Sequence, residues 1–250
     1  MSPPLRSAAA LLLLALAGPA GAQAIGQGDG KLVTLQGIRS ATVAPAGLGF
    51  AALALSGRAD DDPEDGPASS LSFGLGFGDA ARGVGVQATV SLSPVFDGFG
   101  ESGSLGLKFG RRVSSAGTPT FVALSVDRLA GWGDRSDDDP TASLALTTFP
   151  RLSLGGDAYP LMLTIGAGTG IRDDGTEPGV YAGAGIGLSR NFGASLAWTG
   201  EDVTLGAVVR VPALDSWRFT ASVSDLLDEE DGRRFGITAT YVVQDLFGSR

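Results

Sequence analysis

The chain has 250 residues, of which 18 are basic and 27 acidic, with no histidine, no cysteine and a formal net charge of −9. These absences exclude Ser-His and Cys-His catalysis, disulfides, and metal sites built on His or Cys. The acidic balance argues against a nucleic-acid partner, and 43% apolar residues are too many for a disordered acidic chain. The 39 glycines are about twice the usual share, so the fold must explain them.

The first 22 residues have the pattern of a secretory signal peptide. Arg6 provides a positive charge, residues 8–17 form an apolar run, and residues 20–22 (AGA) supply the small residues of a cleavage site. The run is shorter than the ~20 apolar residues that span a bilayer as a helix. We therefore expect export and a mature chain that begins at Gln23.

Residues 23–45 are glycine-rich and precede any strand pattern. We expect them to be a periplasmic tether or, if the strands that follow close into a barrel, a plug in its lumen. In the second case Lys31 and Arg39 would neutralise charge in the lumen or at its rim.

The remainder, residues 46–250, alternates apolar residues with Gly, Ser, Thr or Ala in short segments. A period of two predicts β-strands with one apolar face. The twelve expected strands lie within residues 47–57, 71–77, 84–92, 105–109, 122–126, 142–146, 161–165, 180–188, 192–198, 203–209, 217–223 and 237–243.

The face opposite the apolar one has little bulk and few charges, which suits a lumen better than the surface of a soluble sandwich. The expected fold is therefore all-β, an antiparallel up-and-down transmembrane β-barrel of about twelve strands. Ten or fourteen strands remain open, because the first strand and residues 141–169 are ambiguous.

Acidic residues concentrate in alternate connections between these strands. The first, third and later odd connections carry 22 of the 27 acidic residues: 58–68, 94–102, 127–140, 170–178, 200–202 and 225–234. Alternate connections of a meander emerge at the same end of a barrel. One end is thus expected to be strongly acidic, and we place it outside the cell because outer loops are usually the longer ones.

This pattern resembles that of bacterial outer-membrane β-barrel proteins of the porin-like type. The resemblance implies location in the outer membrane of a Gram-negative bacterium, with outer-membrane lipid and lipopolysaccharide as partners. It also implies aromatic girdles near the strand ends. The candidates are Phe109, Phe149, Tyr159, Phe192, Trp198, Trp217, Phe219 and Tyr241.

Three basic residues are expected to face the lumen near its periplasmic end: Lys108, Arg210 and Arg218. Basic residues in a pore favour anions, although these three could instead pair at the rim.

The acidic runs of the outer loops are Asp60, Asp61, Asp62, Asp137, Asp138, Asp139, Asp173 and Asp174. Solvated charge is the simplest interpretation of such runs, and binding of divalent cations is the alternative. Nothing in the sequence assigns a catalytic residue, a metal ligand set or a cofactor.

The sequence therefore favours a non-enzymatic barrel, either a narrow passive channel or a structural barrel. Two alternatives stay open: a surface-binding or adhesion barrel without a pore, and a soluble secreted β-protein.

Overall fold

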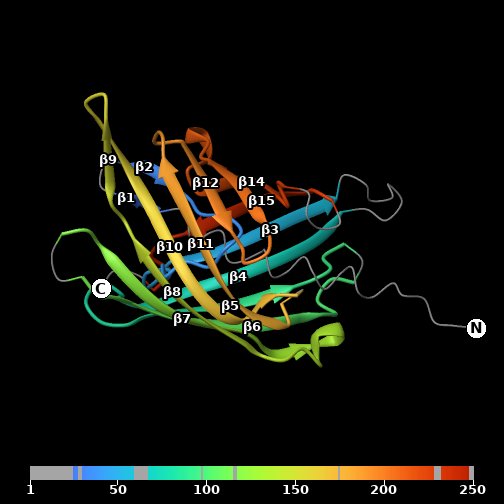
Figure 1. Ribbon diagram of the computed structural model, residues 1–250. Coiled ribbons are helices and arrows are strands. Elements are labelled where there is room, and N and C mark those ends of the chain that lie inside the picture. Colours follow the sequence, from blue (N-terminus) through green and yellow to red (C-terminus); the bar gives the residue numbers. More distant parts are fainter. Residues whose placement is uncertain are drawn as a thin grey trace, which may run out of the picture.

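The computed structural model describes residues 25–27, 30–58, 67–96, 98–114, 117–173, 175–227 and 232–247 (Figure 1). The predicted signal peptide lies outside these residues. Within them, no helix is long and apolar enough to cross a membrane.

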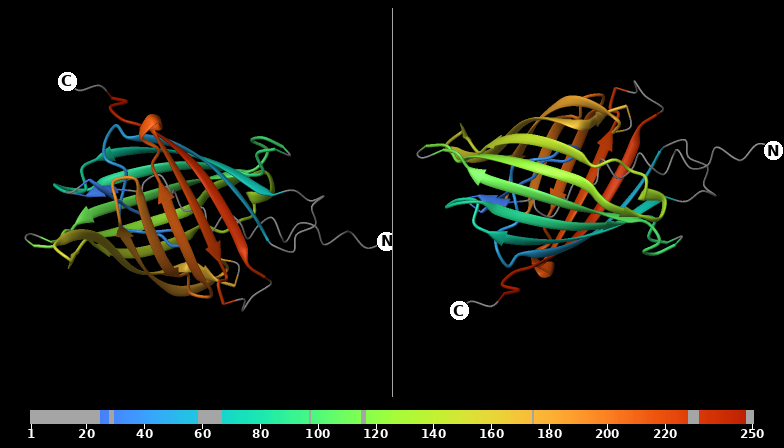
Figure 2. Two further views of the ribbon diagram at one scale, coloured as in Figure 1. Left: turned by 90° about the horizontal axis from the view of Figure 1, so that it is seen from above. Right: turned by 90° about the horizontal axis from the view of Figure 1, so that it is seen from below.

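Twelve antiparallel strands form a closed barrel (Figures 1 and 2). They are β3 (Gly49–Arg58), β4 (Ala68–Gly78), β5 (Gly85–Leu92), β6 (Gly103–Arg112), β7 (Thr120–Trp132), β8 (Thr141–Thr148), β10 (Asp157–Arg172), β11 (Glu177–Gly187), β12 (Phe192–Trp198), β13 (Val203–Val209), β14 (Trp217–Ser224) and β15 (Arg234–Val243). Pairing of β15 with β3 and of β10 with β11 completes the ring. The predicted up-and-down barrel of twelve strands is confirmed.

Most large apolar residues of the wall point outward and most inward residues are small; Phe50, Met162, Tyr181 and Val208 are among the large side chains buried inside. In β8, Leu144 and Leu146 are exposed, whereas Ser143, Ala145 and Thr147 are buried inside the barrel. A closed ring leaves no free strand edge, and an outward apolar face suits lipid.

The strand β7 is longer than the alternation predicts, so the predicted connection at 127–140 begins too early. The register between β6 and β7 shifts near Leu105, and Arg128 and Ala130 have positive φ angles of 59° and 46°. Such a bulge breaks the period-two pattern without ending the strand. Asp127 consequently belongs to the barrel wall.

The ambiguous region after β8 forms the short strand β9 (Arg151–Leu154), which pairs with the first residues of β10 in a hairpin. Phe149, expected in an aromatic girdle, is instead buried and meets Phe121 edge-on, with ring centroids 6.0 Å apart. The prediction for this side chain was wrong because the chain leaves the wall between β8 and β9 and turns the ring toward the interior.

Three short elements complete the fold: β1 (Ile25–Gln27), which pairs with β2 (Lys31–Val33), and two 3₁₀ turns, η2 (Gly133–Arg135) and η3 (Pro212–Leu214). The connections that follow β3, β5, β7, β10, β12 and β14 lie at one end of the barrel, here called the acidic end. The other end, called the turn end, carries the remaining connections and the β9–β10 hairpin.

Candidate functional site: the barrel lumen

Residues 31–45, here called the lumen segment, lie inside the barrel (Figure 2). The amide of Leu32 donates to the Ser189 carbonyl at 2.8 Å, so the segment starts beside the β11–β12 connection at the turn end. Its middle, at Gly37, packs against Thr204 at the start of β13, close to the acidic end. The segment therefore spans most of the depth of the lumen.

Apolar side chains of the lumen segment form a core with the wall. Val33 and Leu35 are completely buried, and Ile38 is nearly so. The wall contributes Ala123, Ala145, Met162, Tyr181 and Ala197 to the same cluster, and Phe149 joins it from the connection between β8 and β9. Burial of one such side chain contributes roughly 1.5–3 kcal/mol, so three of them strongly favour a segment held inside.

Five inward glycines of β11, β12 and β13 form a flat surface, called the glycine face, under the first half of the segment. They are Gly183, Gly185, Gly187, Gly193 and Gly206. A Cβ atom at Gly183 would lie 2.7 Å from Cδ1 of Ile38, and one at Gly185 would overlap the carbonyl oxygen of Thr34. Part of the glycine excess thus reflects close approach between the segment and the wall.

Hydroxyl groups of the wall satisfy backbone amides of the lumen segment. Thr147 Oγ1 accepts from the amide of Ala41 at 2.8 Å, and Ser195 Oγ accepts from the amide of Gln36 at 3.2 Å. Because a buried amide without a partner is costly, these bonds fix the position of the segment along the lumen.

The lumen contains a small group of charges around Asp127. Arg39 Nε of the lumen segment lies 3.0 Å from Asp127 Oδ2. Lys108 of β6 is buried, interacts electrostatically with both groups, and donates a long bond of 3.4 Å to the carbonyl of Thr42. The two cations and one carboxylate leave this group with a net positive charge.

The other two basic residues expected in the lumen lie together at the turn end. Arg210 follows the last residue of β13 and pairs with Asp215 at 3.0 Å. Arg218, the second residue of β14, donates to the carbonyl of Asp215 at 2.6 Å. The structure separates this pair at the rim from Lys108 in the interior.

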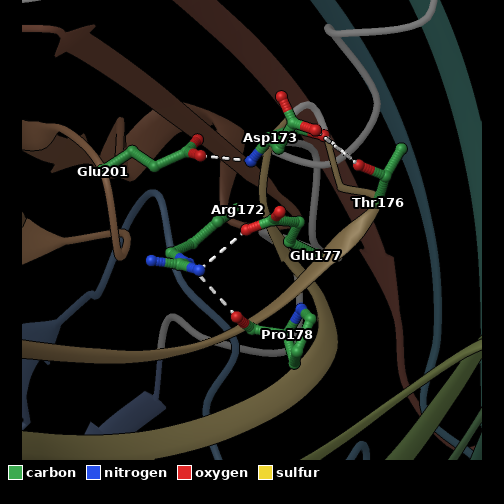
Figure 3. Close-up of polar contacts among 6 residues, drawn as sticks. All are labelled: Arg172, Asp173, Thr176, Glu177, Pro178 and Glu201. Atoms are coloured by element: carbon green, nitrogen blue, oxygen red, sulfur yellow. Dashed lines mark hydrogen bonds and ion pairs between the residues drawn. The ribbon is translucent and has the colours of Figure 1, made fainter.

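At the acidic end, neighbouring loops are joined by polar contacts (Figure 3). Arg172 pairs with Glu177 at 2.7 Å across the base of the β10–β11 loop. The amide of Asp173 donates to Glu201 of the β12–β13 loop, and Thr176 donates to the carbonyl of Asp173 at 2.6 Å. Asp173 is thus engaged in loop structure through its backbone.

The β7–β8 loop is ordered by its own ion pair. Arg135 is buried and lies 3.4 Å from Asp138. Burial lowers the pKa of the Arg135 guanidinium, and the nearby Asp138 charge opposes that shift. The neighbouring carboxylates Asp137 and Asp139 complete the run that the sequence singled out.

The remaining acidic candidates, Asp60, Asp61, Asp62 and Asp174, lie outside the described residues. Within the described part of the chain, no group of three or more carboxylates is arranged to hold a metal ion.

The part of the wall formed by β14, β15, β3, β4 and β5 differs from the glycine face. Its buried inward residues include Ser70, Ser72, Thr220, Ser224 and Thr240. Other inward residues of these strands are half-buried, namely Ala54, Ser56, Ser91, Ser222 and Thr238. We call this part of the wall the hydroxyl face; solvent reaches some of its inward residues.

The fold defines the class of protein: a closed up-and-down barrel of the bacterial outer-membrane type, with porins as structural neighbours. The KdgM porin is similar with a TM-score of 0.50 and 12% identity, over 77% of this chain and 98% of the porin. The COG4313 outer-membrane channel from Pseudomonas putida F1 has a TM-score of 0.47 and 11% identity, over 80% of this chain and 97% of the channel. The expected resemblance to outer-membrane β-barrel proteins is confirmed as a likeness of fold.

A third structure, Acinetobacter baumannii Omp33, has a TM-score of 0.47 and 9% identity, over 78% of this chain and 97% of Omp33. No protein-family model matches the sequence, and no curated protein is similar to it.

Several lumen residues were missed by the sequence analysis. Asp127 was assigned to a loop, and Gln87, whose side chain accepts from the amide of Ala44 at 3.0 Å, resembled any polar residue of a strand. The available signal was in the segment itself, because Leu32, Val33 and Leu35 are too apolar for a solvated tether.

Proposed function

We propose that this protein is a passive channel of the outer membrane of a Gram-negative bacterium, exported by its signal peptide and not an enzyme. The observation that carries the proposal is the reversed polarity of the barrel wall: leucines outside, serines and threonines inside. A soluble β-protein would bury its apolar face, whereas this arrangement suits lipid around an aqueous lumen.

The charges of the lumen support a preference for anions. Lys108 and Arg39 outnumber Asp127 in the interior, and Arg210 and Arg218 add positive charge at the turn end. A positive constriction raises the local concentration of anions and excludes cations.

The proposed orientation puts the acidic end outside the cell. In this orientation the loop carboxylates face lipopolysaccharide and the divalent cations that accompany its phosphates. Carboxylate oxygens are suitable partners for such hard cations.

A second candidate function is a structural or surface-binding barrel without a pore. The observation that favours it is the lumen segment, whose buried core occupies the space that a solute would need.

Two measurements test the proposal. The protein should fractionate with outer membranes and migrate differently on gels before and after heating, as stable barrels do. A soluble periplasmic fraction would overturn the membrane assignment.

In planar bilayers the purified barrel should give small conductances with an anion-selective reversal potential, and Lys108→Gln should reduce that selectivity. A barrel that inserts and never conducts would favour the second candidate.

A further inference from the structure

The lumen segment enters and leaves the barrel at the same end. At its start, Lys31 Nζ donates to the carbonyl of Ala158 at 2.9 Å and lies 3.8 Å from the ring centroid of Tyr159, in the β9–β10 hairpin. At its exit, the amide of Gly47 donates to Gly76 of β4 at 3.1 Å. The described chain thus makes a loop into the lumen and back, with both ends of this loop at the turn end.

The barrel does not depend on this segment for its strand pairing. Among the described strands, β2 pairs only with β1, while every wall strand has two wall neighbours. Removal of the segment therefore leaves the hydrogen-bonded ring complete.

The ion pair between the segment and the wall is partly exposed. Arg39 and Asp127 have side chains 18% and 35% exposed, so water and salt reach the ion pair. Partly exposed ion pairs are of low strength and are sensitive to competing ions. Lys108 beside them is buried and donates the long bond to Thr42 described above.

We propose that the lumen segment is a gate, which withdraws from the lumen toward the turn end, and that the Arg39–Asp127 ion pair adds to the buried core and the hydroxyl hydrogen bonds in holding it in place. The inference rests on the proposed channel function. With the segment in place, it occupies most of the depth of the lumen; with it withdrawn, the glycine face and the hydroxyl face line a continuous passage.

The absence of cysteine makes a direct test available. The double variant Ala41→Cys/Thr147→Cys places a thiol on the segment beside a thiol on β8, where the Ala41 amide and Thr147 Oγ1 are 2.8 Å apart. A matched control, Thr120→Cys/Thr148→Cys, joins β7 to β8 at a cross-strand pair whose hydroxyls are 3.0 Å apart, without touching the segment.

Oxidation of the first pair should abolish channel openings in planar bilayers, and reduction should restore them; oxidation of the control pair should leave openings unchanged. Asp127→Asn should raise the open fraction several-fold. Equal conductance of the oxidised and reduced forms of the first pair would overturn the gate and leave the channel intact. Absence of conductance in all variants, including Asp127→Asn, would overturn the channel function and the gate with it.

Trypsin provides a readout that does not require conduction. Withdrawal should expose Lys31 and Arg39 to cleavage in Asp127→Asn, and the oxidised Ala41→Cys/Thr147→Cys pair in the same background should suppress cleavage after Arg39. Heat-modifiable migration of each variant verifies that the barrel has formed. Cleavage at Arg39 that is the same with and without the disulfide would overturn the withdrawal.

Discussion

The glycine face and the hydroxyl face use the same strand geometry for two different tasks. On the glycine face, side chains are reduced to hydrogen so that the backbone of the lumen segment lies directly on the wall. On the hydroxyl face, many of the side chains that line the lumen are small and polar, and several are half-buried and in contact with solvent. The glycine face therefore packs as a protein core, whereas the hydroxyl face leaves part of its polar lining to solvent.

Two places in the wall share one packing arrangement, a glycine covered by an aromatic ring. Gly166 is paired with Tyr181 across β10 and β11, and Gly74 is paired with Phe50 across β3 and β4. In both pairs a Cβ on the glycine would overlap the ring. The ring covers an otherwise bare strand. Tyr181 also packs in the core with the lumen segment, whereas Phe50 belongs to a separate cluster with Ala52.

The largest effect should come from truncation of a core side chain of the lumen segment. Leu35→Ala should lower the free energy of unfolding by about 2–5 kcal/mol, because it leaves a cavity in a fully packed interior. The matched control is Leu196→Ala on the outward face, which should cost much less. Urea titration in micelles measures both, and equal losses would mean that the core is not tightly packed.

Addition of bulk to the glycine face should have the next largest effect. Gly185→Val should displace the segment and cost about 1–3 kcal/mol, because Thr34 occupies the space that the new side chain needs. The comparison variant is Ser222→Val on the hydroxyl face, where the side chain is half-buried. Trypsin cleavage after Arg39 should increase only in the first variant; cleavage of both, or of neither, would remove the distinction between the faces.

Two buried threonines provide a matched pair for the same substitution. Thr147→Val should cost about 1–3 kcal/mol, because it leaves the amide of Ala41 without its acceptor. Thr240→Val should be neutral or slightly stabilising, because Thr240 Oγ1 has no partner among the described residues. Thermal unfolding followed by circular dichroism would show the difference, and a loss at Thr240 as large as that at Thr147 would contradict it.

The smallest effect concerns pH. Burial raises the pKa of the Asp202 carboxyl, in the loop before β13, and hydrogen bonds from Thr199 and Thr204 oppose this shift. The folded protein therefore keeps this proton to a higher pH than the unfolded chain does, so the contribution of Asp202 to stability decreases as pH rises between the two pKa values. Asp202→Asn should make the free energy of unfolding less dependent on pH in that interval. A steeper dependence in the variant would contradict the expected direction.

The strands could be predicted because the alternation of apolar and small residues is a local pattern. Period-two alternation across residues such as Leu144 and Leu146 gave the strands, and their number gave the barrel. The prediction failed where local order is broken by a bulge, at Asp127, and where an aromatic residue follows a strand end, at Phe149. In both cases the side-chain direction depends on backbone geometry that residue types do not encode directly.

The sequence by itself predicted an export signal. It also determined the twelve strands, their outward and inward faces, and the placement of the acidic connections at one end. These follow from alternation and counting, since neighbouring strands of a meander pair in order. The tertiary structure decided that residues 31–45 lie in the lumen, that Arg39 meets Asp127, and that the inward glycines of β11 to β13 accommodate a backbone. Such contacts join positions far apart in the chain, and only closure of the ring brings them within bonding distance.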